Sequence, residues 1–242
     1  MNISKNDIIG RVVAMDYRTA GVFEQRGIDF CCNGNRSIEA ACEEQKISTE
    51  ELIDSLQRMV DKPSKKEGVG NFEEWPLDLL ADYIEKKHHR YVREQIPVIQ
   101  AFLGKIVLVH GGIHPELSKI KMHFDACAIE LAAHMKKEEL MLFPFIRKMV
   151  QAKTDEYAGT TAPFGTVRNP IQMMMYEHDT EGQRFREIGK LSNRYTTPAD
   201  GCNTYKAAFA TLQAFEEDLH LHIHLENNIL FPGAIEMEQY FG

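Results

Sequence analysis

The chain has 242 residues, of which 43% are hydrophobic and 26% charged, a globular composition that excludes wholesale disorder. Acidic residues outnumber basic ones by 36 to 28, and the net charge of −8 argues against a nucleic-acid or anionic-membrane surface. No apolar run is long enough to span a bilayer, and five cysteines are too few for a secreted disulfide scaffold. We therefore expect a cytoplasmic protein.

Residues 1–60 predict a small helical domain of four short helices. Gly27 is suited to end the second helix, and Ser37 and Ser48 are suited to open the third and fourth. The loop between the second and third helices carries two adjacent thiols, Cys31 and Cys32. The polar, Pro- and Gly-containing segment 61–70 predicts a linker.

Residues 71–242 predict an all-α, up-down four-helix bundle, because long amphipathic segments joined by short loops pack in this way. The four expected helices run from Pro76 to about His110, from Pro115 to about Pro144, from Asn169 to about Arg194, and from after Gly201 to about Pro232. The prolines near the ends of the second and fourth segments are interpreted as helix ends.

The strongest signal is an internal repeat within these helices. In each copy a histidine precedes a glutamate by four residues, and the glutamate precedes a proline by six; the copies span residues 134–144 and 222–232. Each copy also has a histidine on the preceding helix: His89 lies 45 residues before His134, and His178 lies 44 residues before His222. Nearly equal spacing in two helix pairs indicates a duplicated hairpin.

Helix geometry predicts that the repeated side chains face the core, since residues four apart share one helix face. The apolar stripes of the second and fourth helices lead directly into the motif: Ile120, Phe124, Cys127, Leu131, His134, Glu138, and Leu212, Phe215, Leu219, His222, Glu226, Ile229. A carboxylate within an apolar stripe is costly unless its charge is compensated. Four histidines and two carboxylates suit two iron or manganese ions, with Glu138 and Glu226 bridging them.

The first helix leaves its ligand open, because His88 and His89 are adjacent. The helical spacing of the apolar residues before them, Leu80 and Ile84, places His88 on the inward face. The spacing of the apolar residues after them places His89 there instead. The repeat spacing favours His89 only weakly. A competing, ferritin-like interpretation uses Glu85-x-x-His88 and Glu217-x-x-His220, but it leaves the apolar stripe and ignores the repeat.

Other polar residues near the motif are not expected to bind the metal ions directly. His220 and His224 share a different helix face from His222, so they are predicted to be solvated or to support the site from outside. Glu139 lies one residue off the stripe beside Glu138 and is predicted to be dispensable for metal binding. Cys31 and Cys32 are too few and too close for a structural zinc site. A redox or metal-capturing role for them and simple packing of a tight loop both remain open.

Taken together, the two His-x3-Glu elements ending in Leu-Phe-Pro, the Glu-His-Asp around His178 and the Asp-Phe-Cys-Cys-Asn-Gly near the N-terminus resemble the Repair of Iron Centres family. This similarity covers essentially the whole chain. It implies a hemerythrin-like di-iron bundle, preceded by the short domain that carries vicinal cysteines in many members; these match Cys31 and Cys32. The implied iron ligands are His89, His134, Glu138, His178, His222 and Glu226, and the alignment favours His89 over His88.

The resemblance implies a cytoplasmic stress-response protein, a homodimer in the manner of the family, that restores iron–sulfur clusters damaged by nitric oxide or peroxide. Its partners would be damaged iron–sulfur proteins, with nitric oxide or oxygen as small ligands. Two alternatives use the same residues: an oxygen- or nitric-oxide-binding hemerythrin-like module, and a di-iron nitric oxide reductase. Oxygen-carrying hemerythrins use five histidines and two carboxylates, one of them Asp, whereas this stripe offers four histidines and two glutamates.

Overall fold

The computed structural model describes residues 2–62, 72–155 and 163–241, and these ranges are helical apart from loops and one isolated bridge between Ile8 and Ser37. The N-terminal part contains the four short helices that the sequence predicts: α1 (Ile9–Met15), α2 (Ala20–Gln25), α3 (Ile38–Gln45) and α4 (Thr49–Asp61). The Ser37 and Ser48 side chains accept hydrogen bonds from the first turns of α3 and α4, and Gly27 adopts a positive φ after α2. Most of the predicted linker, 61–70, lies outside the described residues.

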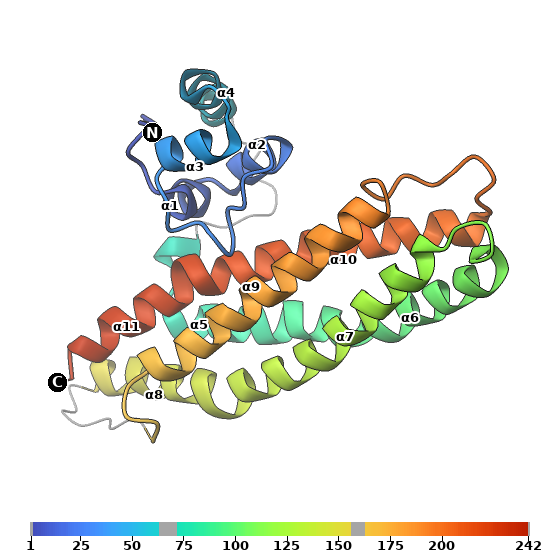
Figure 1. Ribbon diagram of the computed structural model, residues 1–242. Coiled ribbons are helices and arrows are strands. Elements are labelled where there is room, and N and C mark those ends of the chain that lie inside the picture. The colour runs from blue at the N-terminus through green and yellow to red at the C-terminus, as the bar shows by residue number, and fades with distance from the viewer. Residues whose placement is uncertain (1, 63–71, 156–162, 242) are drawn as a thin grey trace.

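Four long rods form the rest of the molecule, an up-down bundle of the predicted hemerythrin-like kind (Figure 1). The first rod is α5 (Leu77–Tyr83), η3 (Ile84–His89) and α6 (Arg90–His110); the second is α7 (Glu116–Lys137), η4 (Glu138–Leu142) and α8 (Phe143–Thr154); the third is α9 (Arg168–Leu191); and the fourth is α10 (Asn203–Leu225), η5 (Glu226–Leu230) and α11 (Phe231–Gln239). α6 packs against α7 and α10, and α7 packs against α9.

Three of these rods contain a wide π turn, and the turns correct the predicted helix ends. The segments η3, η4 and η5 are π-helical, and the second and fourth rods continue beyond Pro144 and Pro232. In η4 the Phe143 N–H donates to the carbonyl of Glu138, five residues back, and Phe231 does the same to Glu226. A proline at the next position has no N–H to donate, and the wider turn accommodates its ring. Proline therefore marks a π turn here rather than a helix end.

The core consists of two apolar clusters separated by a polar layer. One cluster fills the half of the bundle around Leu103, Phe124 and Phe215 and extends into the N-terminal helices. The other fills the opposite half around Ile84, Phe143 and Phe231. The histidines and glutamates of the repeat lie between them and are themselves buried. Apolar packing on both sides of the polar layer therefore holds the helices in fixed positions around it.

The N-terminal helices gather on one side of the bundle, over the rod formed by α10 and α11 (Figure 1). α1 contacts both α10 and η5. Gly10 permits this approach, because a Cβ there would lie 2.6 Å from Cγ of Asn228. The rings of Tyr17 and Phe30 pack against His224. His224 is buried, so of the two alternatives that the sequence left for it, a solvated position is wrong. The second half of the fourth rod is thus covered by the N-terminal unit.

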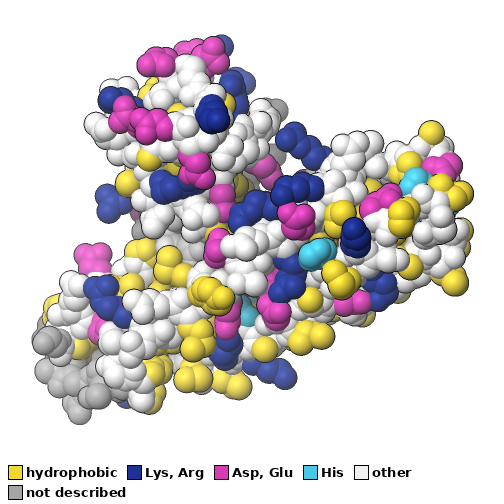
Figure 2. All heavy atoms as spheres, viewed as in Figure 1, with side chains coloured by type: hydrophobic (Ala, Val, Ile, Leu, Met, Phe, Trp, Pro, Cys, Tyr) yellow, Lys and Arg dark blue, Asp and Glu magenta, His cyan; other side chains and the backbone are white. Residues whose placement is uncertain are grey.

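Figure 2 shows Lys and Arg interspersed with Asp and Glu over the visible face, together with patches of hydrophobic side chains along the bundle. The exposed hydrophobic residues of the bundle include Leu140, Met173 and Tyr176. Among the helices that the structure describes, each is too short or too polar to serve as a membrane span.

Candidate metal centre

The structure brings all six residues of the predicted metal site together in the polar layer. Each is at most 3% exposed, and each rod of the bundle contributes at least one of them. They form two groups that share both glutamates: His89, Glu138, His222 and Glu226 in one, and His134, Glu138, His178 and Glu226 in the other. The π turns lie at this level, so that Glu138 and Glu226 each occupy the first position of such a turn and His89 the last.

Within each group, two imidazole nitrogens face each other. The Nε2 atoms of His134 and His178 are 3.0 Å apart, and those of His89 and His222 are 3.2 Å apart. In His89 and His134 the other ring nitrogen, Nδ1, donates to a carboxylate, so that in the neutral ring the lone pair is on Nε2. Two lone pairs cannot face each other at this distance unless a proton or a cation lies between them. The donor set therefore fits a cation in each group.

The two glutamates each direct one oxygen to each group. Glu138 Oε2 lies 3.4 Å from His89 Nε2, and its Oε1 lies 3.3 Å from His134 Nε2. Glu226 Oε1 lies 3.1 Å from His222 Nε2, and its Oε2 lies 3.2 Å from His178 Nε2. Among the described residues, neither oxygen of Glu138 has a hydrogen-bond partner of normal geometry, although both are buried. Buried carboxylate oxygens without partners are expected where a cation binds between two histidine pairs.

The electrostatics of the layer reflect this concentration of buried charge. Burial opposes the charge on His134, yet Glu138 and Glu177 raise its pKa to about 10. Burial likewise opposes the charge on His89, and the neighbouring carboxylates of Glu138 and Glu226 raise its pKa to about 10. Although burial disfavours its ionisation, the surrounding imidazoles hold the pKa of Glu226 well below its ordinary value. Both glutamates are thus held as carboxylates, which are the forms that bind metal ions.

The residues of the competing ligand sets point elsewhere. His88 Nδ1 lies 3.0 Å from Asp218, and its ring stacks on His222 at 5.6 Å between centroids. Glu85 pairs with Arg147. Glu217 is exposed, and His220 lies 3.7 Å from Glu24 of the N-terminal unit. The ferritin-like set is therefore not assembled.

Two carboxylates outside the predicted ligand set orient two of the histidines, a role that the sequence did not indicate. Glu139 accepts a 2.7 Å hydrogen bond from Nδ1 of His89, and Glu177 accepts one of 2.7 Å from His134. Glu139 therefore contacts a residue of the centre, which the sequence did not suggest, whereas its dispensability for metal binding stays a prediction. Carboxylates next to metal-binding histidines fix the ring orientation and strengthen the ligand. The sequence feature that could have identified these two carboxylates is that each is adjacent to a predicted metal ligand: Glu139 follows Glu138, and Glu177 precedes His178.

The loop with Cys31 and Cys32 lies against this layer, on the side of His178. The Cys32 thiol is 3.4 Å from the backbone oxygen of His178, and the two sulfur atoms are 3.7 Å apart. Asp29 accepts hydrogen bonds from the backbone N–H groups of both cysteines. Hydrogen bonding with Cys32 and burial raise the pKa of the Cys31 thiol. The distance between residues 32 and 178 in the chain left no sequence signal for this contact.

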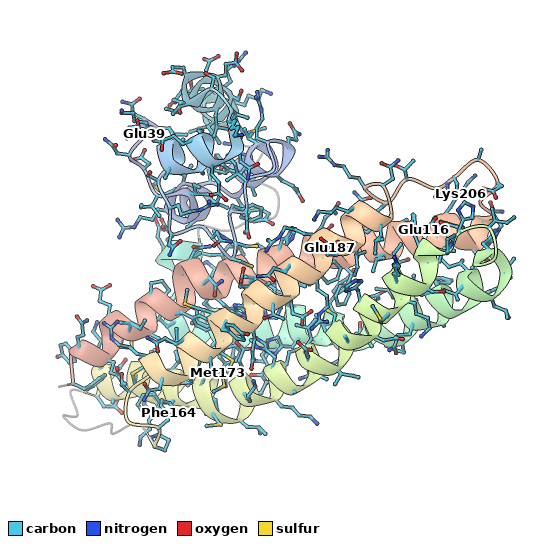
Figure 3. The ribbon with its side chains drawn as sticks, in the orientation of Figure 1. Glu39, Glu116, Phe164, Met173, Glu187 and Lys206 are labelled. Carbon is cyan, nitrogen blue, oxygen red and sulfur yellow. The ribbon has the colours of Figure 1, made fainter. Side chains whose placement is uncertain are left out.

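A cavity of about 530 Å³ lies between α7 and α9 and reaches the second group of ligands. His134 and His178 form part of its wall, together with Glu177 and Glu181. Met173, labelled on α9 in Figure 3, lies at the same cavity. Burial raises the pKa of Glu181, and its Oε2 atom has no hydrogen-bond partner among the described residues. The cavity therefore adjoins one side of the centre.

Comparisons with known families match both parts of the chain. A family model described as a hemerythrin HHE cation binding domain matches residues 80–234, which include all six residues of the centre. A second model, ScdA_N, described as a domain of unknown function, matches residues 5–60 with both vicinal cysteines.

Similar proteins extend over nearly the whole chain. The iron-sulfur cluster repair protein ScdA of Staphylococcus haemolyticus is 28% identical, over 95% of this chain and 98% of its own length. The iron-sulfur cluster repair proteins YtfE of Yersinia pseudotuberculosis and Yersinia pestis are 30% and 31% identical, each over 97% of this chain and 99% of their own length. With both domains matched and these relatives aligned end to end, the chain belongs to the family of iron–sulfur cluster repair proteins that combine an ScdA_N domain with a hemerythrin HHE domain.

Proposed function

We propose that the protein holds two iron ions in the polar layer and uses them to repair iron–sulfur clusters damaged by nitrosative or oxidative stress. One ion would be bound by His89 and His222 and the other by His134 and His178, with Glu138 and Glu226 bridging. The observation that carries this proposal is the placement of one oxygen of each glutamate against each histidine pair. Imidazole and carboxylate ligands suit iron, and the names of the relatives favour it over manganese.

The protein's own residues would orient the ligands and leave room for exchange. Glu139 and Glu177 keep Nδ1 protonated on two of the histidines, so that Nε2 is free to bind. Four side-chain ligands per ion are fewer than the six that iron commonly takes, which leaves open positions. Bound iron would supply either the ion that is delivered to a damaged cluster or the centre at which nitric oxide reacts. The cavity between α7 and α9 is the candidate route for either species.

The decisive experiment measures iron content and repair in the same preparation. Metal-free protein is loaded with Fe(II) under anaerobic conditions, and we expect two irons per chain. The loaded protein should then restore activity to a nitric-oxide-inactivated iron–sulfur enzyme, whereas the metal-free protein should not. If nitric oxide is consumed catalytically while the damaged enzyme stays inactive, the reductase alternative replaces repair. Reversible oxygen binding without repair would favour the binding module.

We further propose that the N-terminal unit, with the vicinal cysteines, contacts the damaged client or couples to it by redox chemistry. Cys31 is buried and Cys32 is half-buried, so a client would reach the Cys31 thiol only when the loop moves. Replacing both by serine should keep two irons per chain and lower the rate of repair. A large drop of the thermal midpoint in this double variant would instead favour a packing role.

A further inference from the structure

One buried side chain lies between the cysteine loop and a histidine of the metal centre. Asn227, in the π turn η5, is 7% exposed. Its Oδ1 atom is 2.8 Å from Nδ1 of His178, and its Nδ2 atom is 3.1 Å from the backbone oxygen of Cys31. Among the described residues outside the cysteine loop, no other side chain has hydrogen bonds to both this loop and a histidine of the centre.

The direction of these two hydrogen bonds is fixed by chemistry. A backbone carbonyl only accepts, so the amide NH2 of Asn227 must face Cys31, and its oxygen must then face His178. His178 therefore donates from Nδ1 and keeps its lone pair on Nε2, which points at Glu226 Oε2 and His134 Nε2. The orientation of Asn227 thus decides which nitrogen of His178 is free for a metal ion.

Asn227 also differs from the partners of the other histidines. His89 and His134 donate to carboxylates, and Nδ1 of His222 has no hydrogen-bond partner among the described residues. His178 alone has an amide partner, and this amide is shared with a segment of the N-terminal unit. The Cys32 thiol adds a second contact to the same histidine, at 3.4 Å from its backbone oxygen. The absence of a side chain at Gly182 permits this approach, since a Cβ there would lie 3.0 Å from Cys32 Sγ.

We propose that Asn227 is a positioning residue that couples the cysteine loop to the metal position of His178. While the loop is seated, Asn227 holds His178 in its metal-binding tautomer. Displacement of the loop takes away the acceptor of the Asn227 amide and frees Asn227 to rotate, which weakens metal binding at this position. This inference rests on the proposed di-iron function for its meaning, but its first consequences are measurable in the metal-free protein.

Two variants separate the two halves of the contact. Asn227→Asp retains an acceptor for His178 and removes the donor to Cys31. Asn227→Ala removes both. In metal-free protein, nitrogen-15 spectra of the histidine rings should show Nδ1 of His178 protonated in the wild type and in Asn227→Asp, and this preference should be lost in Asn227→Ala. Both variants should expose Cys31 and Cys32 to a thiol reagent faster than the wild type does. His178→Gln identifies the resonance.

Asn228→Ala is the matched control. Asn228 donates to the backbone oxygen of Phe30 in the same loop and contacts His224, but it has no hydrogen bond to His178. This variant should speed thiol modification, which reports the rarely populated displaced state of the loop, and leave the His178 tautomer unchanged in the seated state that dominates the spectrum. After iron loading, Asn227→Ala should lose affinity at one of two positions by about 10- to 100-fold, whereas Asn228→Ala should keep both.

An unchanged His178 tautomer in a folded Asn227→Ala protein would overturn the proposal, as would thiol rates in Asn227→Asp equal to those of the wild type. If Asn227→Ala does not fold, the Asn227→Asp and Asn228→Ala pair still decides the coupling to the loop. The metal-free measurements also separate this inference from the proposed function. Failure of every variant and of the wild type to bind iron would refute the di-iron function without altering the tautomer and thiol results.

Discussion

At the scale of single residues, the main energetic cost of the centre is the burial of charged side chains. Glu138 and Glu226 are fully buried carboxylates, and the nearest positive groups are protonated imidazoles or a bound cation. Two divalent cations in this layer would repel each other strongly, because the bundle interior screens charge poorly. The two bridging carboxylates are the groups placed to offset that repulsion.

Glu226→Gln should therefore yield one iron per chain or none, since the amide keeps the shape and removes the charge. Iron content after anaerobic loading is the measurement, with circular dichroism to show that the helices persist. Glu217→Gln, an exposed position on the same helix, is the matched control and should bind two irons. Glu139→Gln is not a suitable control, because Glu139 orients His89. Equal iron content in the Glu226 and Glu217 variants would disprove the bridging role.

The shifted pKa values predict how the stability of the metal-free protein depends on pH. The pKa values of His89 and His134 are about 10 in the fold, against an ordinary 6.5. The folded state binds these protons more tightly than the unfolded chain, so the stabilisation is complete below pH 6.5 and is lost as the pH rises toward 10. The hydrogen bond from His134 lowers the pKa of Glu177 to about 2 from 4.5, so its contribution is present above pH 4.5 and is lost as the pH falls through 2.

We expect the urea midpoint of the metal-free protein to be highest near pH 6.5 and to fall between pH 7 and 10. It should also fall below pH 6.5, because burial lowers the pKa of His224 to about 3 and the unfolded chain then binds that proton more tightly. Glu177→Gln removes a partner of His134 and should flatten the alkaline fall. A midpoint that stays constant from pH 6 to 10 in the wild-type protein would contradict the raised pKa values.

At the scale of elements, the π turns explain a conflict that the sequence contains. Leu80 and Ile84 predict that His88 faces inward, whereas Val92 and Ile99 predict His89, and a regular helix cannot satisfy both. The π turn over Ile84–His89 adds one residue to the turn, so that all four apolar residues are buried and His89 enters the centre. In the fourth rod the π turn η5 likewise buries Leu230, whereas the regular helical stripe predicted that Ile229 would be the buried residue.

Shortening a π turn should therefore disrupt packing beyond it. Leu140 lies in η4 and is 76% exposed, so its side chain contributes little to the core. Its deletion would restore a regular turn and rotate α8 by about 100° relative to α7. Phe143 and Ile146, which are fully buried, could not both keep their sites. We expect a loss of about 3–5 kcal/mol and a thermal midpoint lower by roughly 10 °C.

Leu140→Ala is the control for that deletion, because it shortens the same side chain without changing the register. It should change the free energy of unfolding by no more than about 0.5 kcal/mol. If deletion and substitution have the same thermal midpoint, η4 does not set the register of α8.

Periodicity predicted the helical rods and the inward faces of α7 and α10, because a 3.6-residue repeat is visible in one sequence. The six residues of the centre followed from the repeat and from the family resemblance. The π turns escaped prediction, since their hydrogen bonds depend on how the flanking helices pack. The roles of Glu139 and Asn227 also escaped it, because their partners His89 and His178 lie on other rods, and no local spacing encodes that proximity.

At the scale of the whole molecule, the N-terminal unit and the bundle share one apolar cluster, so they are expected to be stable together. The junction is held by the two asparagines of η5, of which Asn228 donates to the Phe30 carbonyl at 3.3 Å. Gly10 on α1 lies directly over Asn228, and its N–H donates to the Gly34 carbonyl at 2.7 Å. This packing leaves little room for a side chain at position 10.

Gly10→Ala should therefore destabilise the junction. The new methyl group would lie 2.6 Å from Cγ of Asn228 and 3.2 Å from the Gly34 oxygen, so α1 or Asn228 must shift. Overpacking of this kind costs about 1–3 kcal/mol, and we expect a lower thermal midpoint together with faster modification of Cys31 and Cys32. Gly21→Ala on α2 is the matched control, since its Cβ meets nothing within 4 Å and alanine favours the helix. Equal midpoints and thiol rates in the two variants would show that the loop is held independently of α1.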